Sequence, residues 1–434
     1  MKTGSGISIL PRGSVRIRAA NLAWWILLAA IVSVWVHGLH PSVAGVDARY
    51  YFKAALDMQA GRNPYLSGDF LYPPATAWLL VPAVRGLSDA ALAIGFNLLI
   101  YASVIMLAAG SFLLAGMKPG FGRNQDWWLI PFLLAFLLFS PVTAIATGLG
   151  NISPLVGALC VWAGYLHSKN RPAGAVLLVA AATILKIVPG LLLVFLFWRS
   201  IGTRDRRLLG WSLVGIFVAA AGILLPPGTA DFLRGAGGDT KWGIDIGGAA
   251  VSIHVWLARV LDLPALNHPD IAMVIFGIGA ILASGYGYFL RHRETVAWVS
   301  VMVLCDVTSP KNCPHLFLAL GFPVIAMFAR HTAAAFAVET TAGSEPPGRR
   351  RTSSGGFVSL LLSGEAPPTT GITRLGGFFF SLALPWIAVS SEYFYMRGSL
   401  AGEIILPVIP VILLLLQTWV INRWNRTEPT NVRS

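Results

Sequence analysis

The sequence contains little charge for its length. Only 12% of its 434 residues are charged, whereas 56% are hydrophobic, and the mean hydropathy is +0.69. A soluble chain carries roughly twice this charged fraction, because its surface faces water. The composition therefore excludes an ordinary soluble protein and predicts a chain that crosses a membrane several times.

Cysteine is also scarce, and the common nucleotide-binding and metal-binding motifs are absent from the sequence. The three cysteines, Cys160, Cys305 and Cys313, lack metal-ligand spacing and can form at most one disulfide. The sequence has no G-x-x-x-x-G-K-[ST] phosphate loop, no H-E-x-x-H zinc motif and no C-x-x-C pair. Redox chemistry is not indicated, and we predict no metal and no other cofactor.

The charge that is present is mostly basic, with 32 Lys and Arg residues against 19 Asp and Glu, a net charge of +13. The basic residues do not gather into a face with interleaved aromatic residues, so nucleic-acid binding is not predicted. They fall in short clusters between apolar runs, which by the positive-inside rule mark cytoplasmic loops. These clusters are Arg12, Arg16 and Arg18; Lys169 and Arg171; Arg199, Arg204, Arg206 and Arg207; Arg291 and Arg293; Arg330; and Arg349, Arg350 and Arg351.

The apolar runs predict an all-α fold, a polytopic transmembrane helical bundle with an amphipathic surface helix in its first outer loop. A helix needs about 20 apolar residues to span the bilayer, and on this criterion we expect about 10 to 13 crossings. The candidate helices are 20–38, 72–86, 90–116, 128–147, 152–167, 173–186, 190–200, 209–226, 271–290, 295–308, 316–330, 373–391 and 403–421.

The same pattern divides the chain into regions. We predict a cytoplasmic N-terminal segment (1–19), a membrane domain (20–330), a disordered basic cytoplasmic loop (331–372), a transmembrane helix pair (373–421) and a cytoplasmic tail (422–434). The first apolar run lacks a small-x-small cleavage pattern, so we interpret it as an uncleaved helix. The basic loop either binds anionic lipid or only orients the chain.

One loop conflicts with the charge rule. Lys118 and Arg123 lie outside if both 72–86 and 90–116 cross the membrane. Either this loop is an exception or one of the flanking segments is re-entrant.

Polar residues recur in the segments assigned to the outer end of the helices. The first is "GVDARYYFKAALDMQAGRNPYL", residues 45–66, in which Asp47 precedes an amphipathic helix. An Asp at this place is either an N-cap of the helix or a carboxylate base held at the membrane rim, or both. The helical period sets two faces: Tyr51, Ala54, Ala55 and Met58 on one, and Arg49, Lys53 and Asp57 on the other.

Three further segments follow in order. In "FLYPP", Tyr72 precedes two prolines that are typical of a helix start. In "TGLGNISP", Asn151 serves a turn or donates to a ligand. In "ILKIVPGLLLV", Lys186 either snorkels to the interface or binds a phosphate, and the Pro-Gly after it indicates a broken helix.

A last segment, "CDVTSPKNCPHLF", holds Asp306, Lys311, Asn312 and His315 between two apolar helices. A histidine titrates near neutral pH, so His315 is suited to act as a base or a phosphate partner. The density of polar residues in this segment favours a functional role.

Taken in order, these segments resemble the membrane glycosyltransferases of the GT-C superfamily, and specifically family 87 (DUF2029), which includes polyprenyl-phosphate-mannose-dependent mannosyltransferases. The resemblance covers roughly residues 20–330. Two positions depart from the family pattern. Leu149 stands where Gln is common, and "NCPH" lacks the aromatic and second polar residue that often precede His315.

The resemblance implies a reaction and a set of roles. Asp47 matches the acidic residue that acts as general base in GT-C enzymes, and His315 shares that role or binds phosphate. Arg49, Tyr50, Lys53, Tyr72, Asn151, Lys186, Lys311 and Asn312 are the residues expected to bind the donor phosphate or the substrate. The expected partners are a polyprenyl-phosphate sugar donor, a lipid or glycan acceptor and membrane lipids, with the active site on the periplasmic or extracellular side of the plasma membrane.

Two other classes remain open. Broken helices and a lysine within an apolar stretch are also typical of transporters or flippases. Against this class, the two halves of the chain show no evident repeat, and the polar segments gather at the outer end. A catalytically inactive scaffold is the third alternative.

Overall fold

The computed structural model describes 12–37, 39, 44–65, 70, 72–118, 128–232, 261, 263, 265, 268–290, 294–309, 319–327 and 329–330. All regular secondary structure in these residues is helical, which confirms the predicted class. The helices are α1 (Arg12–His37), α2 (Val46–Gln59), α3 (Pro74–Trp78), α4 (Val81–Gly86), α5 (Asp89–Leu114), α6 (Leu129–Leu138), α7 (Pro141–Leu149), α8 (Ser153–Ser168), α9 (Pro172–Leu185), α10 (Gly190–Thr203), α11 (Arg206–Leu224), α14 (Pro269–Phe289) and α15 (Glu294–Thr308).

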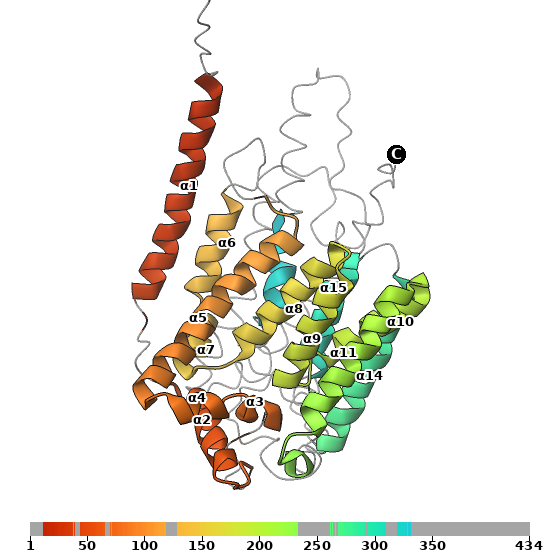
Figure 1. The fold of residues 1–434 in the computed structure, drawn as a ribbon. Helices are drawn as coiled ribbons and strands as arrows, with labels where there is room; N and C mark the ends of the chain where they lie inside the picture. The colour runs from red at the N-terminus through yellow and green to blue at the C-terminus, as the bar shows by residue number, and fades with distance from the viewer. Residues whose placement is uncertain are drawn as a thin grey trace, which may run out of the picture.

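Within the described residues, three helices are long and apolar enough to cross a membrane by themselves: Asp89–Leu114, Arg206–Leu224 and Asp270–Phe289. The pair α6 and α7 passes the same test together, with a bend of 46° between its parts. Of the shorter apolar helices, α9 and α10 lie among them, whereas α1 lies at the edge of the bundle (Figure 1). The helices predicted at 373–391 and 403–421, and the loop 331–372 between them and the bundle, lie outside the described residues.

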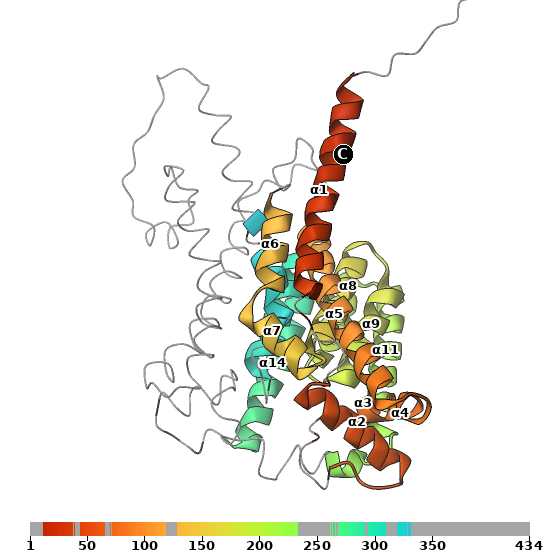
Figure 2. The same cartoon turned by 90° about the vertical axis from the view of Figure 1, so that its left-hand side faces the viewer.

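The long helices run between two ends of the bundle. One end carries α2, α3 and α4, which both views place together (Figures 1 and 2), and we call it the Asp47 end. At the other end lie the turn after α8, with Lys169 and Arg171, and the turn after α10, with Arg204 (Figure 1). We call this the basic end.

The prediction of a crossing helix at 72–86 is wrong. The segment forms two short helices, α3 of five residues and α4 of six, and each is only about 9 Å long or less. Pro82 occupies the first turn of α4, and because proline has no N–H it cannot continue the α3 hydrogen-bond ladder. Both pieces therefore stay at the Asp47 end.

This break removes the conflict with the charge rule. Because α3 and α4 do not cross, α5 runs from the Asp47 end to the basic end, and Lys118 follows four positions after its last residue, Leu114, whereas Arg123 lies outside the described residues. Arg330 lies at the basic end too, since its Nη1 donates to the carbonyl of Ala115 at 2.5 Å. Of the two alternatives, the structure favours the re-entrant segment, because 72–86 forms two short helices at the Asp47 end.

The helix predicted at 128–147 is also interrupted. The first part, α6, ends at Leu138, and the hydroxyl of Ser140 accepts from the N–H of Thr143 at 3.1 Å, which caps α7. Pro141 occupies the first position of α7, where its missing N–H costs no hydrogen bond. The bend directs the end of α7 towards α2.

Small residues allow the helices to pack closely. A methyl group at Gly287 of α14 would overlap the backbone of Phe195 on α10, and one at Gly157 of α8 would overlap Ala319. Close backbone approach of this kind is the usual basis of helix association in lipid. The largest apolar core lies between these helices and includes Phe195, Trp298 and Phe322.

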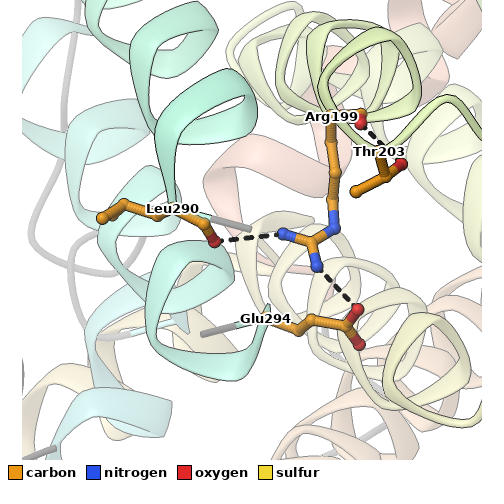
Figure 3. Close-up of polar contacts among 4 residues, drawn as sticks. All are labelled: Arg199, Thr203, Leu290 and Glu294. Atoms are coloured by element: carbon orange, nitrogen blue, oxygen red, sulfur yellow. Dashed lines mark hydrogen bonds and ion pairs between the residues drawn. The ribbon is translucent and has the colours of Figure 1, made fainter. Parts of the chain in front are cut away.

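At the basic end, Arg199 does more than orient the chain. Its side chain is only 2% exposed, and its Nη2 donates to Oε1 of Glu294 at 2.6 Å, while Nη1 donates to the carbonyl of Leu290 at 3.4 Å (Figure 3). The contacts tie α10 to the connection between α14 and α15. A residue assigned to a basic loop from sequence is therefore a buried clamp between helices.

We expect the two partners of this clamp to respond unequally to substitution. Glu294→Ala removes the carboxylate from a buried guanidinium and should cost about 3 kcal/mol of stability. Arg199→Met leaves a carboxylate that is 47% exposed and stays hydrated, so the loss should be about 1 kcal/mol. Thermal unfolding of the purified protein in detergent measures both, and a larger loss for Arg199→Met would contradict this account.

Candidate active site

The site begins with α2, whose inner face is buried. Ala48, Tyr51, Ala54 and Ala55 are buried, whereas Arg49 and Lys53 are exposed on the other side, as the helical period predicted. This face packs on a second apolar core with Phe70, Phe96, Ile100 and Ile152. The burial fixes α2 at the end of the bundle and sets the direction in which its first turn points.

Asp47 lies in this first turn, but it is not the N-cap. Gly45 occupies the N-cap position, and no side chain caps the helix there. The expectation that Asp47 caps α2 is therefore wrong, because the helix begins one residue before it. Its carboxylate instead accepts a hydrogen bond from Nδ2 of Asn151 at 2.5 Å, across 104 positions of sequence.

Two glycines allow Asn151 to come so close. Gly150 ends α7 in the left-handed conformation (φ 65°), and a methyl group there would approach Cβ of Ala48 to 2.8 Å. A methyl group on Gly45 would overlap the backbone carbonyl of Leu149. The turn role expected for the "GLGN" segment is confirmed, and the turn lies directly against the start of α2.

Asn151 is buried and joins several partners. Its Nδ2 also donates to the hydroxyl of Tyr72 at 3.1 Å. Its Oδ1 accepts from the N–H of Ser153 at 2.8 Å and from the hydroxyl of Ser153 at 2.6 Å. Three segments of the chain thus meet at one amide.

Lys186 reaches the same cluster from α9. It follows the last residue of that helix with an extended backbone (φ −154°, ψ 121°), and α10 begins only at Gly190, so the predicted break is confirmed. Its Nζ donates to Oγ of Ser153 at 3.1 Å and lies 5.9 Å from the centre of the Tyr72 ring. The ammonium therefore lies at the Asp47 end rather than in the middle of the bundle.

The loop before Tyr72 is held by the segment that follows α11. Nδ2 of Asn63 donates to Oδ2 of Asp231 at 2.8 Å, and the hydroxyl of Tyr65 donates to the carbonyl of Tyr72 at 2.9 Å. The ring of Tyr65 also packs on Phe232, with centroids 5.9 Å apart. Five segments of the chain thus support the cluster of Asp47, Tyr72, Asn151, Ser153 and Lys186, which we call the polar cluster.

Tyr51 is buried next to the polar cluster. Its ring packs edge-on against Tyr72, with centroids 4.8 Å apart. Burial raises the pKa of the Tyr51 hydroxyl, and neighbouring Tyr72 and Asp47 raise it further. Tyr51 therefore remains a neutral phenol beside the carboxylate.

The predicted residues divide into three groups. Asp47, Tyr72, Asn151 and Lys186 come together. Arg49 and Lys53 are exposed, with Nε of Arg49 donating to the carbonyl of Ala44 at 3.0 Å, and Tyr50 is half-buried. Lys311, Asn312 and His315 lie outside the described residues.

Sequence reasoning missed Ser153 and Tyr51. A signal for Ser153 was present, because an Asn followed two positions later by Ser is typical of a turn in which the Asn oxygen accepts the later N–H. Tyr51 appeared only as one apolar position of the α2 stripe. In the described part of the chain, no three His, Cys, Asp or Glu side chains lie together as a metal site would require.

The fold and the polar cluster define a multi-pass helical membrane protein with a carboxylate and an ammonium at one end of its bundle. Residues 70–310 match the model of glycosyltransferase family 87, and since they make up more than half of the chain, the protein belongs to this family of membrane glycosyltransferases. The matched range includes Tyr72, Asn151, Ser153 and Lys186 and begins after Asp47.

Among solved structures, the chain is similar to the crystal structure of ArnT from Cupriavidus metallidurans bound to undecaprenyl phosphate. The similarity covers 94% of this chain and 79% of that one, with 14% identity and a TM-score of 0.37.

Proposed function

We propose that this glycosyltransferase moves a sugar, mannose, from a polyprenyl-phosphate donor to a lipid or glycan acceptor at the outer membrane surface, with Asp47 as general base. The observation that carries the proposal is the polar cluster, in which Asp47 and Lys186 are linked through Asn151 and Ser153 at one end of an apolar bundle. A lipid-linked donor stays in the bilayer, so its head group and the acceptor must meet at such an end. The family resemblance of the sequence supports mannose as the sugar.

The reaction assigns a role to each charged group. Asp47 takes the proton of an acceptor hydroxyl as that oxygen forms a bond to the anomeric carbon. The bond from this carbon to the phosphate oxygen breaks on the opposite face, so the configuration inverts. The polyprenyl phosphate leaves with the bonding pair, and its charge calls for cationic stabilisation, which Lys186 supplies.

Transfer by the purified wild-type protein is the direct test. The protein is incubated with radiolabelled polyprenyl-phosphate mannose and total membrane lipid, and a labelled glycolipid is the expected product. Release of the label as free mannose alone, or no product from any polyprenyl-phosphate sugar, would contradict the proposal. Movement of a solute across vesicles by the same preparation would favour the transporter class instead.

The orientation of the site has its own test. Because basic loops stay in the cytoplasm, we expect the Asp47 end to face outward. In a chain whose native cysteines are replaced by alanine, Lys53→Cys on α2 should react with an impermeant maleimide on intact cells, and Arg206→Cys at the basic end should react only after permeabilisation. Both positions are exposed in the structure, so a difference in labelling reflects the side of the membrane and not burial of the cysteine. The reverse pattern would place the site inside.

A further inference from the structure

Asn151 has no hydrogen-bonding capacity left for a substrate. A side-chain amide can accept two hydrogen bonds at its oxygen and donate two from its nitrogen. In this structure the oxygen accepts two from Ser153, and the nitrogen donates one to Asp47 and one to Tyr72. The residue is also only 1% exposed.

The orientation of this amide is fixed by the backbone. The N–H of Ser153 can only donate, so the atom of Asn151 that faces it must be the oxygen. The NH₂ group must then face Asp47 and Tyr72. A donor aimed at Asp47 stabilises the ionised form of that carboxylate, which is the form that accepts a proton.

Ser153 connects the two charged groups. Its hydroxyl donates to Asn151 and accepts from Lys186, and the residue is fully buried. The hydroxyl has one proton to donate, so it can satisfy both contacts only in this direction. The polar cluster is therefore a continuous chain of hydrogen bonds from the ammonium of Lys186 to the carboxylate of Asp47.

We propose that Asn151 and Ser153 are positioning residues of the transferase. Asn151 orients Asp47 and keeps it ionised, and Ser153 holds that amide at a fixed distance from Lys186. The acceptor and the donor phosphate contact Asp47, Tyr72 and Lys186, and Asn151 touches neither substrate. The inference rests on the proposed function, because it assigns these residues to the transfer reaction.

The kinetic test separates positioning from binding. In the assay with radiolabelled polyprenyl-phosphate mannose and membrane lipid, Asn151→Leu should lower kcat about 100-fold and leave the KM for the donor within twofold, since a misplaced base affects the chemical step. Lys186→Met should instead raise the KM for the donor about tenfold or more and also lower kcat, because it removes a cation that binds the phosphate and stabilises the charge that develops on it. Ser153→Ala should show both effects in weaker form, each about threefold to tenfold.

A second readout does not depend on transfer. A hydrophobic carbodiimide reacts with protonated carboxyl groups, and mass spectrometry locates the labelled residue. The pH midpoint for labelling of Asp47 should move to higher pH in Asn151→Leu. It should move further in Asn151→Asp, which keeps an oxygen for Ser153 and places a like charge beside Asp47.

A matched control lies in the same segment. Thr147 is buried, and among the described residues its hydroxyl donates only to carbonyls of its own helix, Thr143 at 2.8 Å and Ala144 at 3.1 Å. Thr147→Val should leave kcat, the donor KM and the labelling midpoint of Asp47 near the wild-type values. If Thr147→Val lowers kcat as much as Asn151→Leu does, the effect of Asn151→Leu reflects general damage to the α7–α8 turn, and the inference is wrong.

The outcomes distinguish this inference from the proposed function. If Asn151→Leu raises the donor KM at unchanged kcat, Asn151 is a substrate ligand and the inference is wrong. If Asn151→Leu and Asn151→Asp leave the midpoint of Asp47 unchanged, the amide does not control the carboxylate, and the inference is again wrong. If the wild type transfers nothing, the proposed function fails, while the labelling midpoints still test the link between Asn151 and Asp47.

Discussion

Replacing Asp47 by Asn should lower the rate of sugar transfer about 1,000-fold and leave the donor KM almost unchanged. A general base contributes about 100- to 10,000-fold to the rate, and an amide cannot take the proton of the acceptor hydroxyl. The substituted amide keeps the shape of the carboxylate and can present its oxygen to Nδ2 of Asn151, so the contact that holds the first turn of α2 is retained. Initial rates at saturating acceptor lipid measure the effect.

Asp57 provides the matched control on the same helix. Its Oδ1 pairs with Nη2 of Arg62 at 2.7 Å, away from the polar cluster, and Arg62 is largely exposed. Exposed pairs of this kind contribute little to stability, so Asp57→Asn should keep activity within twofold. If both variants lose activity equally, the effect reflects the charge of α2 rather than a base. If Asp47→Asn keeps wild-type activity, Asp47 is not the base.

Replacing Gly45 by Ala should lower kcat about 100-fold without unfolding the protein. The residue has φ −66°, which alanine adopts without strain, so the effect arises only from the added methyl group. That group would overlap backbone atoms of Gly148 and Leu149, which cannot move aside as a side chain can. The start of α2 must therefore shift away from the "GLGN" turn, and a displacement of about 1 Å in a catalytic group costs about 100-fold in rate.

Gly148 in the same contact region gives the control. A methyl group there meets no atom within 4 Å, and the residue lies within α7, where alanine is the better helix former. Gly148→Ala should therefore keep kcat and slightly raise the thermal stability, whereas Gly45→Ala loses kcat. Equal kcat values for the two variants would mean that the close approach of α2 to the turn does not matter for the reaction.

Several features follow from local sequence and are confirmed. The two faces of α2 follow from a period that separates Tyr51 and Ala54 from Arg49 and Lys53. The turn at Gly150 and the break after Lys186 follow from glycine and proline, which act on their own few residues. The order of the polar segments was enough to indicate a membrane glycosyltransferase, and the family match bears this out.

Other features depend on contacts between segments that are far apart in the sequence, and the sequence of one segment does not predict them. Residues 72–86 are apolar enough to suggest a crossing, but Pro82 divides them into two pieces that pack on α2 and α5 instead. Arg199 looks like one more cation of a basic loop, and only the position of Glu294 makes it a buried partner. Asp47 looks like a helix cap, and only the approach of Asn151 gives its carboxylate another partner.

The sequence by itself determined that lipid surrounds this protein, since its small charged fraction could not cover a water-facing surface. It also determined the helix break at Lys186 and the segments in which the polar residues lie. The tertiary structure decided which of those residues meet, and in particular that Asn151 and Ser153 link Asp47 to Lys186. The reason is physical: these contacts join segments far apart in the chain, and they form only where glycines let backbones approach and packed helices hold the polar groups in place.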